Sequence, residues 1–169
     1  MAVVAELLQV LRLAYEPSEV FWEVKRQPPA RLAFLILALV LAMRVFGVYC
    51  TGFHFSTVNP EDASLIGELF RLFVPLFSWM VGVYAVSTIM DGEGTLYQLF
   101  VAFGISLFPY VLLTFPEIVL TNVLTLESAL WVRIIQVLKF AWCAFLVFTA
   151  IEVVCQYEVR SCLVVSGLG

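Results

Sequence analysis

The stretch that decides the fold is residues 72–116, LFVPLFSWMVGVYAVSTIMDGEGTLYQLFVAFGISLFPYVLLTFP. It contains two uncharged runs, residues 72–90 and 95–116, which are separated by only four residues. A helix rises about 1.5 Å per residue, so about 20 mostly apolar residues cross the hydrocarbon core of a bilayer. We therefore predict two antiparallel transmembrane helices joined by a tight turn.

The composition is that of an integral membrane protein. Hydrophobic residues make up 63% of the 169 residues, charged residues only 13%, and the mean hydropathy is +1.02. Soluble domains are far less apolar, and this length allows about four or five membrane crossings. The net charge of −4, without a block of basic residues, argues against a nucleic-acid partner. One histidine, His54, and four cysteines without C-x-x-C spacing suggest neither a metal site nor a cofactor.

Two further apolar runs complete the membrane region. The first covers residues 32–49 and includes Arg44, and the last covers residues 134–154 and includes two charges. Residues 161–169 are apolar but too short to cross the bilayer, so they would form an incomplete fifth helix. We predict an all-α polytopic membrane helical bundle with four transmembrane helices.

The amino-terminal part of the chain is amphipathic. Polar side chains recur every three or four positions in residues 2–16, and residues 17–27, PSEVFWEVKRQ, group three apolar side chains on one side of a second helix. Trp22 suits the interface between lipid and water. We therefore predict an interfacial segment, residues 1–30, followed by a transmembrane domain, residues 31–169.

Basic residues indicate the orientation. Those on the amino-terminal side of the first span and behind the fourth are Arg12, Lys25, Arg26, Arg31 and Arg160. Four others lie toward the opposite side. Because cytoplasmic segments carry an excess of Lys and Arg, we expect a multi-pass protein of the cell membrane with a cytoplasmic amino terminus.

The tight turn consists of two carboxylates and two glycines, Asp91, Gly92, Glu93 and Gly94. Glycine easily adopts the backbone angles of such a reversal, and Thr95 followed by Gln98 fits a capping box for the next helix. A carboxylate pair for metal binding or acid–base chemistry would need further ligands or a base, and neighbouring sequence offers none. We interpret the stretch as a turn rather than an active site.

Prolines interrupt both runs of the hairpin. Pro75 and Pro109 imply kinks in the second and third spans. Gly104 and Ser106, together with Pro109, could form a flexible joint. A static kink, with its freed carbonyl bonded by a neighbouring helix, is the simpler interpretation.

Four basic residues map toward the same ends of their spans: Arg44, Arg71, Arg133 and Lys139. We place the carboxylates that could balance them in loops just beyond, at Glu61, Asp62, Glu68, Glu117 and Glu127. Snorkelling and ion pairing at the headgroup level explain this pattern, and a site for an anionic headgroup or solute is the alternative. Lys139 and Glu152 are about 20 Å apart along one helix, so each needs a partner on another span or an interface.

Three pieces of the sequence are typical of one family: PSEVFWEVK before the first span, MDGEGTLYQLFVAFGISLFPY across the turn and third span, and NVLTLE after it. The more specific parts are the turn, residues 90–94, and the third-span motif Gly104, Ser106, Pro109 and Tyr110. Over about residues 15–160 the chain resembles the bacterial members of the Yip (Ypt-interacting protein) domain family. The resemblance implies a small polytopic membrane protein with a cytoplasmic amino-terminal segment, five helices and no enzymatic activity. Eukaryotic relatives act in vesicle trafficking through Rab-type GTPases.

These observations suggest a non-enzymatic membrane scaffold or adaptor. Its expected partners are the lipid bilayer, other membrane proteins such as transporter subunits, or further copies of the chain. The alternative is a small permease or an accessory subunit of a transporter, because Pro75, Pro109 and the charges inside the spans are features of transporters. An intramembrane enzyme using Asp91 and Glu93 is a third hypothesis.

Overall fold

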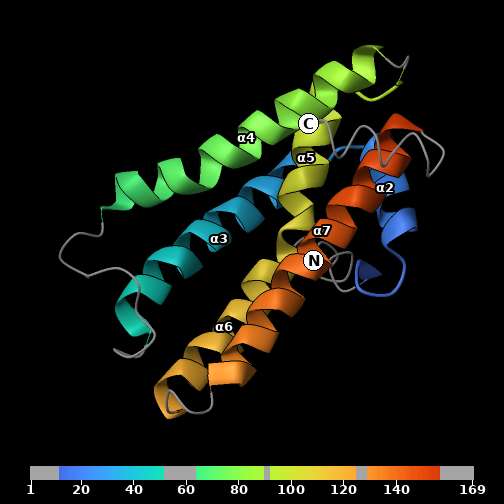
Figure 1. The fold of residues 1–169 in the computed structure, drawn as a ribbon. Helices are drawn as coiled ribbons and strands as arrows, with labels where there is room; N and C mark the ends of the chain where they lie inside the picture. The colour runs from blue at the N-terminus through green and yellow to red at the C-terminus, as the bar shows by residue number, and fades with distance from the viewer. Residues whose placement is uncertain (1–11, 52–63, 90–91, 125–128, 157–169) are drawn as a thin grey trace.

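The computed structural model describes residues 12–51, 64–89, 92–124 and 129–156, and within these ranges the regular structure is entirely helical (Figure 1). The helices are α2 (Pro17–Arg26), α3 (Ala30–Cys50), α4 (Leu65–Ile89), α5 (Leu96–Ser106), α6 (Phe108–Val123) and α7 (Ala129–Cys155). Four segments are long and apolar enough to cross a membrane, namely α3, α4, α5 together with α6, and α7. The prediction of an all-α polytopic membrane bundle is confirmed. The incomplete fifth helix and residues 2–11 of the first amphipathic helix lie outside the described residues.

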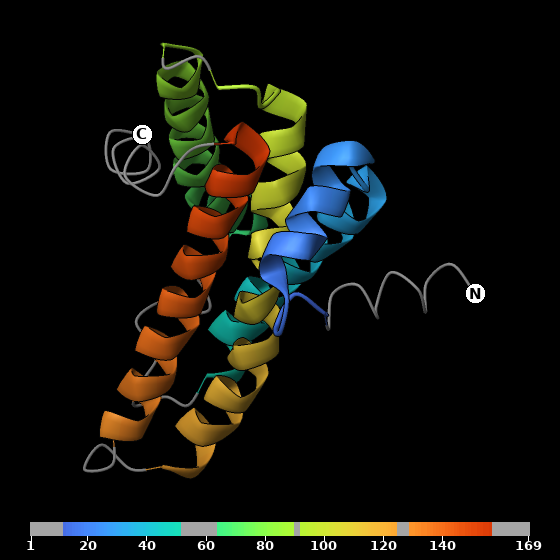
Figure 2. The ribbon, with the colours of Figure 1, turned by 90° about the vertical axis from the view of Figure 1, so that its right-hand side faces the viewer.

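The four crossings run in alternating directions (Figures 1 and 2). One end of the bundle, here named the turn end, contains α2, the start of α3, the turn between α4 and α5, and the end of α7. At this end the Ser87 hydroxyl of α4 lies 3.5 Å from the Cys155 sulfur of α7. The opposite end, here named the arginine end, contains the ends of α3 and α6 and the starts of α4 and α7. There the Asn122 amide of α6 donates to the Cys50 carbonyl of α3 at 2.7 Å.

The third crossing, α5 followed by α6, occupies the centre of the bundle. Helices α3 and α7 both pack against α5 and α6, whereas α4 packs mainly on α3 and α5. Half of the most apolar window of the third crossing is buried inside the protein, compared with 17% for α4. Helix α4 therefore lies at the periphery and turns most of its surface outward (Figure 1).

Three helices extend clearly beyond the spans predicted from hydropathy. Helix α4 begins at Leu65 rather than at residue 72, α6 continues through Pro116 to Val123, and α7 begins at Ala129 rather than at residue 134. The loop placement of Glu68 and Glu117 was therefore wrong, because both residues are helical. A span predicted from hydropathy ends at a charged residue. The helix itself can continue past a carboxylate where a cation on a neighbouring helix neutralises it.

The third crossing is broken rather than merely kinked. Helix α5 ends at Ser106, Leu107 adopts φ −82° and ψ 1°, and α6 starts at Phe108. Pro109 lies in the first turn of α6, where backbone N–H groups have no acceptor within the helix, so the N–H that proline lacks is not needed there. The proline thus begins a new helix, and the Ser106 hydroxyl donates to the Ala102 carbonyl within α5 at 2.8 Å.

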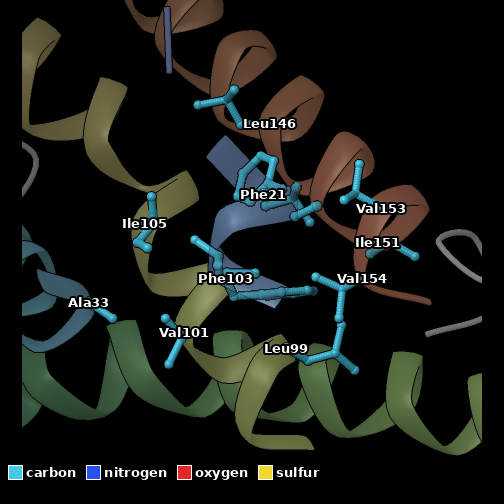
Figure 3. Close-up of a cluster of buried hydrophobic side chains, with 14 of the residues drawn as sticks. Phe21, Ala33, Leu99, Val101, Phe103, Ile105, Leu146, Ile151, Val153 and Val154 are labelled. Carbon is cyan, nitrogen blue, oxygen red and sulfur yellow. The ribbon is translucent and has the colours of Figure 1, made fainter. Parts of the chain in front are cut away.

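Helix α2 contributes to the hydrophobic core near the turn end. The predicted helix is confirmed, and its apolar side chains Val20, Phe21 and Val24 are buried. Figure 3 shows Phe21 among side chains from α5 and α7, including Phe103 and Leu146. The expected interfacial helix therefore packs its apolar face on protein, and Trp22 remains 45% exposed on the other side.

Candidate functional site

The turn between α4 and α5 binds helix α2. The capping box is confirmed, because the Gln98 N–H donates to the Thr95 hydroxyl at 3.2 Å and the Thr95 N–H donates to the Gln98 side chain at 3.0 Å. The Gln98 amide also donates to the Lys25 carbonyl of α2 at 2.8 Å. The Lys25 ammonium lies 3.2 Å from the Glu93 carboxylate. The turn thus caps α5 and holds the end of α2 against the bundle.

Gly94 lies in close contact with the end of α7. None of the described glycines has a positive φ, so the unusual backbone angles expected for this turn do not explain Gly94. A Cβ at Gly94 would lie 3.1 Å from both the Cys155 sulfur and a Val154 methyl carbon at the end of α7. Asp91, the other predicted carboxylate of the turn, lies outside the described residues. No group of three or more His, Cys, Asp or Glu in the described parts of the chain could hold a metal ion.

Gly104 allows α5 to approach α3 closely at the centre of the bundle. A Cβ at Gly104 would lie 3.0 Å from the Cβ of Ala33, and Ala33, Gly104 and Ser106 are all buried. Small residues permit such close contact between transmembrane helices, where dispersion forces depend on distance. Gly104 of the third-span motif therefore serves helix packing.

We expect Gly104→Ala to lower the free energy of unfolding by about 1–3 kcal/mol, because α3 or α5 must shift to accommodate the methyl group. Unfolding in mixed detergent–SDS micelles would measure the change. Gly47→Ala in α3 is the matched control, since its added Cβ meets only a side-chain carbon of Ile118 at 3.9 Å. That substitution should be neutral or slightly stabilising, because alanine favours helix more than glycine. Equal effects of both substitutions would contradict the packing role of Gly104.

A first ion-pair cluster joins α3 and α4 near the arginine end. The Glu68 carboxylate, with a side chain only 6% exposed, lies 2.9 Å from the Arg44 guanidinium and 3.0 Å from that of Arg71. Both carboxylate oxygens are used, Oε2 by Arg44 and Oε1 by Arg71. The cluster connects two neighbouring crossings and satisfies a carboxylate that would otherwise be costly to bury.

A second cluster joins α6 and α7 deeper in the bundle. Lys139, ten residues or about 15 Å from the start of α7, is 4% exposed and forms an ion pair with Glu117. Gln136 donates to the other oxygen of Glu117 at 2.9 Å, and the Thr114 hydroxyl lies 3.5 Å from the Lys139 ammonium. Among the described residues, no buried side-chain nitrogen or oxygen lacks a hydrogen-bond partner. This cluster is therefore neutral and internally satisfied.

Tyr110 lies between the two clusters. The Lys139 ammonium lies 4.5 Å from the centre of the Tyr110 ring, a distance typical of a cation–π interaction. The Tyr110 hydroxyl group lies close to the Arg44 guanidinium. Tyr110 belongs to the first turn of α6, and its side chain contacts Lys139 of α7 and Arg44 of α3. We name the residues of both clusters and Tyr110 the ion-pair layer.

The structure brings together three of the four basic residues predicted to share one level: Arg44, Arg71 and Lys139. Arg133 is exposed on α7 and takes no part in the ion pairs of the described residues, and the same holds for half-buried Glu152. Sequence reasoning missed Gln136 altogether. The apolar residues Ile118, Val119 and Leu120 directly after Glu117 could have indicated that the helix continues.

Comparison with known proteins adds one finding. A family model described as the Yip1 domain matches residues 11–168. No curated protein and no solved structure matches the chain.

Proposed function

Because the chain belongs to the Yip1 domain family and crosses the membrane several times, we propose that it is a non-enzymatic membrane scaffold or adaptor. The observation that carries this proposal is the fixed position of α2. Its apolar face is buried on α5 and α7, and its end is held by Glu93 and Gln98. A helix held in this way presents a defined surface to a partner.

Exposed aromatic side chains lie on α2 and just before it. Tyr15, just before the helix, is 89% exposed, and Trp22 is 45% exposed beside Lys25, whose ammonium lies 5.7 Å from the ring centre. Aromatic residues of this kind are enriched where proteins bind one another, and also at the headgroup level of membranes. The proposed partners are other membrane proteins or a second copy of the chain.

Photocrosslinking from position 22 in native membranes tests the adaptor role. A photoreactive residue in place of Trp22 should give one protein adduct of defined mass. The matched control is position 46 in α3, because Phe46 is 46% exposed, like Trp22, but lies toward the arginine end. Lipid adducts alone at both positions would contradict the proposal.

We further propose that the protein lies in the cell membrane and that its turn end faces the cytoplasm. The turn end carries Lys25, Arg26 and Arg31, of which Arg26 and Arg31 take no part in the ion pairs of the described residues, whereas at the other end Arg44, Arg71 and Lys139 are paired with carboxylates. Cytoplasmic segments carry an excess of Lys and Arg, which supports this orientation. A Thr57→Cys variant should react with a membrane-impermeant thiol reagent added outside intact cells. Protection of that cysteine until the cells are lysed would reverse the orientation.

A small permease, or an accessory subunit of a transporter, is the second candidate function. The specific observation is the break at Leu107 next to the charged side chains of the ion-pair layer, since transporters bind solutes beside discontinuous helices. Purified protein in liposomes should then move an ion or solute, and Lys139→Met should stop the flux. Absence of flux from protein that keeps its fold would exclude autonomous transport and leave the roles of adaptor and accessory subunit.

A further inference from the structure

The cluster of Arg44, Glu68 and Arg71 contains two cations and one anion. Arg44 directs both its Nε and one terminal nitrogen to the same oxygen of Glu68, and Arg71 donates one terminal nitrogen to the other oxygen. The neighbouring Lys139–Glu117 pair is balanced one to one. Among the ion pairs of the described residues, the ion-pair layer therefore carries one excess positive charge.

The two arginines that carry this excess charge lie inside the membrane-crossing helices, near the arginine end. Arg44 is six residues from the end of α3, and Arg71 is six residues from the start of α4, so each backbone position is about 9 Å from its helix end. Both side chains are long enough to reach the headgroup level from that depth. A cation there is costly unless an anion compensates it.

The two guanidiniums form the accessible part of the cluster. The side chain of Arg71 is 62% exposed and that of Arg44 is 31% exposed, while Glu68 lies behind them at 6%. Each guanidinium has N–H groups that are not directed at Glu68, because Arg44 uses Nε and one terminal nitrogen and Arg71 uses one terminal nitrogen. The Tyr110 hydroxyl also lies beside the Arg44 guanidinium, so Arg71 has the more accessible donors. Planar guanidinium groups match the oxygens of a phosphate better than an ammonium does.

The surface next to Arg71 is apolar. One turn along the same face of α4, Val74 is 56% exposed and Pro75 is exposed too. Helix α4 is also the least buried crossing. An acyl chain could lie along this surface while its headgroup reaches the two arginines.

We propose that Arg44 and Arg71 bind the phosphate group of an anionic phospholipid in the leaflet at the arginine end. Glu68 is a positioning residue, since it holds the two guanidiniums side by side from the protein interior. The lipid phosphate supplies the negative charge that the cluster lacks. This site does not depend on the adaptor role of α2.

Native mass spectrometry of the full chain, released from micelles containing equal amounts of phosphatidylglycerol and phosphatidylcholine with the same acyl chains, tests the proposal. We expect the wild-type protein to retain phosphatidylglycerol at least about tenfold better than phosphatidylcholine, because only the former has a net negative charge. In Arg71→Gln the cluster becomes a neutral Arg44–Glu68 pair, and the preference should fall below about twofold. Arg71→Lys keeps the charge but loses the planar fork, so it should give an intermediate preference.

Arg133→Gln is the matched control, since Arg133 is an exposed arginine toward the same end without a partner in the described ion pairs. This variant should keep the wild-type preference, which separates a defined site from general attraction to basic residues. Equal retention of both lipids by the wild type, or an unchanged preference in Arg71→Gln, would overturn the proposal. Displacement of phosphatidylglycerol by millimolar inorganic phosphate would also overturn it, because the ligand would then be a soluble anion.

Discussion

Replacing Glu117 by leucine should lower the free energy of unfolding by about 3–5 kcal/mol, because the substitution leaves the Lys139 ammonium buried without its anion. Gln136 would lose its acceptor on Glu117 at the same time. The cation–π contact with Tyr110 cannot replace a full negative charge, since such contacts contribute only about 0.5–2 kcal/mol. Unfolding in mixed detergent–SDS micelles would measure the loss.

A double-mutant cycle separates the ion pair from packing. Lys139→Met removes the cation, and combining it with Glu117→Leu replaces the pair by apolar side chains of similar length. We expect the double variant to recover most of the stability lost in Glu117→Leu, because no buried charge remains. Additive effects of the two substitutions would contradict direct coupling between Lys139 and Glu117. Arg133→Gln on the exposed side of α7 should change stability by less than about 0.5 kcal/mol.

Replacing Phe21 by alanine should lower the free energy of unfolding by about 3–5 kcal/mol, because Phe21 is fully buried and the substitution removes a large side chain from the core. The cavity would lie between α2 and the helices α5 and α7, so α2 should separate from the bundle before the rest unfolds. Hydrogen exchange of the α2 amides would show this as faster exchange than in α7. If α2 were held by lipid alone, Phe21→Ala would leave the free energy of unfolding of the bundle unchanged.

Two variants test which contact holds α2. Trp22→Ala changes the adjacent, partly exposed aromatic residue and should cost less than about 1 kcal/mol, mainly the contact with Lys25. Glu93→Gln removes the ion pair to Lys25, but Glu93 is 64% exposed, so the cost should also stay below about 1 kcal/mol. Comparable losses in Glu93→Gln and Phe21→Ala would show that the ion pair, rather than the buried phenylalanine, positions α2.

Local sequence patterns predicted several elements correctly. Spacing of apolar residues identified α2, and the Thr95 and Gln98 pair identified the start of α5. Both signals act within one or two turns of a helix, where the contacting residues are neighbours in the chain. The same patterns could not show what covers the apolar face of α2, because lipid and an apolar helix surface satisfy it equally well.

The ion-pair layer was predictable only in outline. Uncharged runs indicated that Lys139 needs a partner on another helix, but several carboxylates were available. Glu117 was placed in a loop since each charge lowers the hydropathy of its own window, whatever lies across the bundle. The break at Leu107 likewise depends on Pro109 starting a helix in this packing rather than bending one.

By itself, the sequence determined that the described part of this protein contains four helices able to cross a membrane, because transfer into lipid depends on the composition of each segment. Only the tertiary structure decided that Glu68 joins Arg44 to Arg71, that Glu117 neutralises Lys139, and that α2 completes the core. The physical reason is distance. Electrostatic and dispersion energies depend on which side chains become neighbours in space, and residues 22 to 68 positions apart meet only after the helices pack.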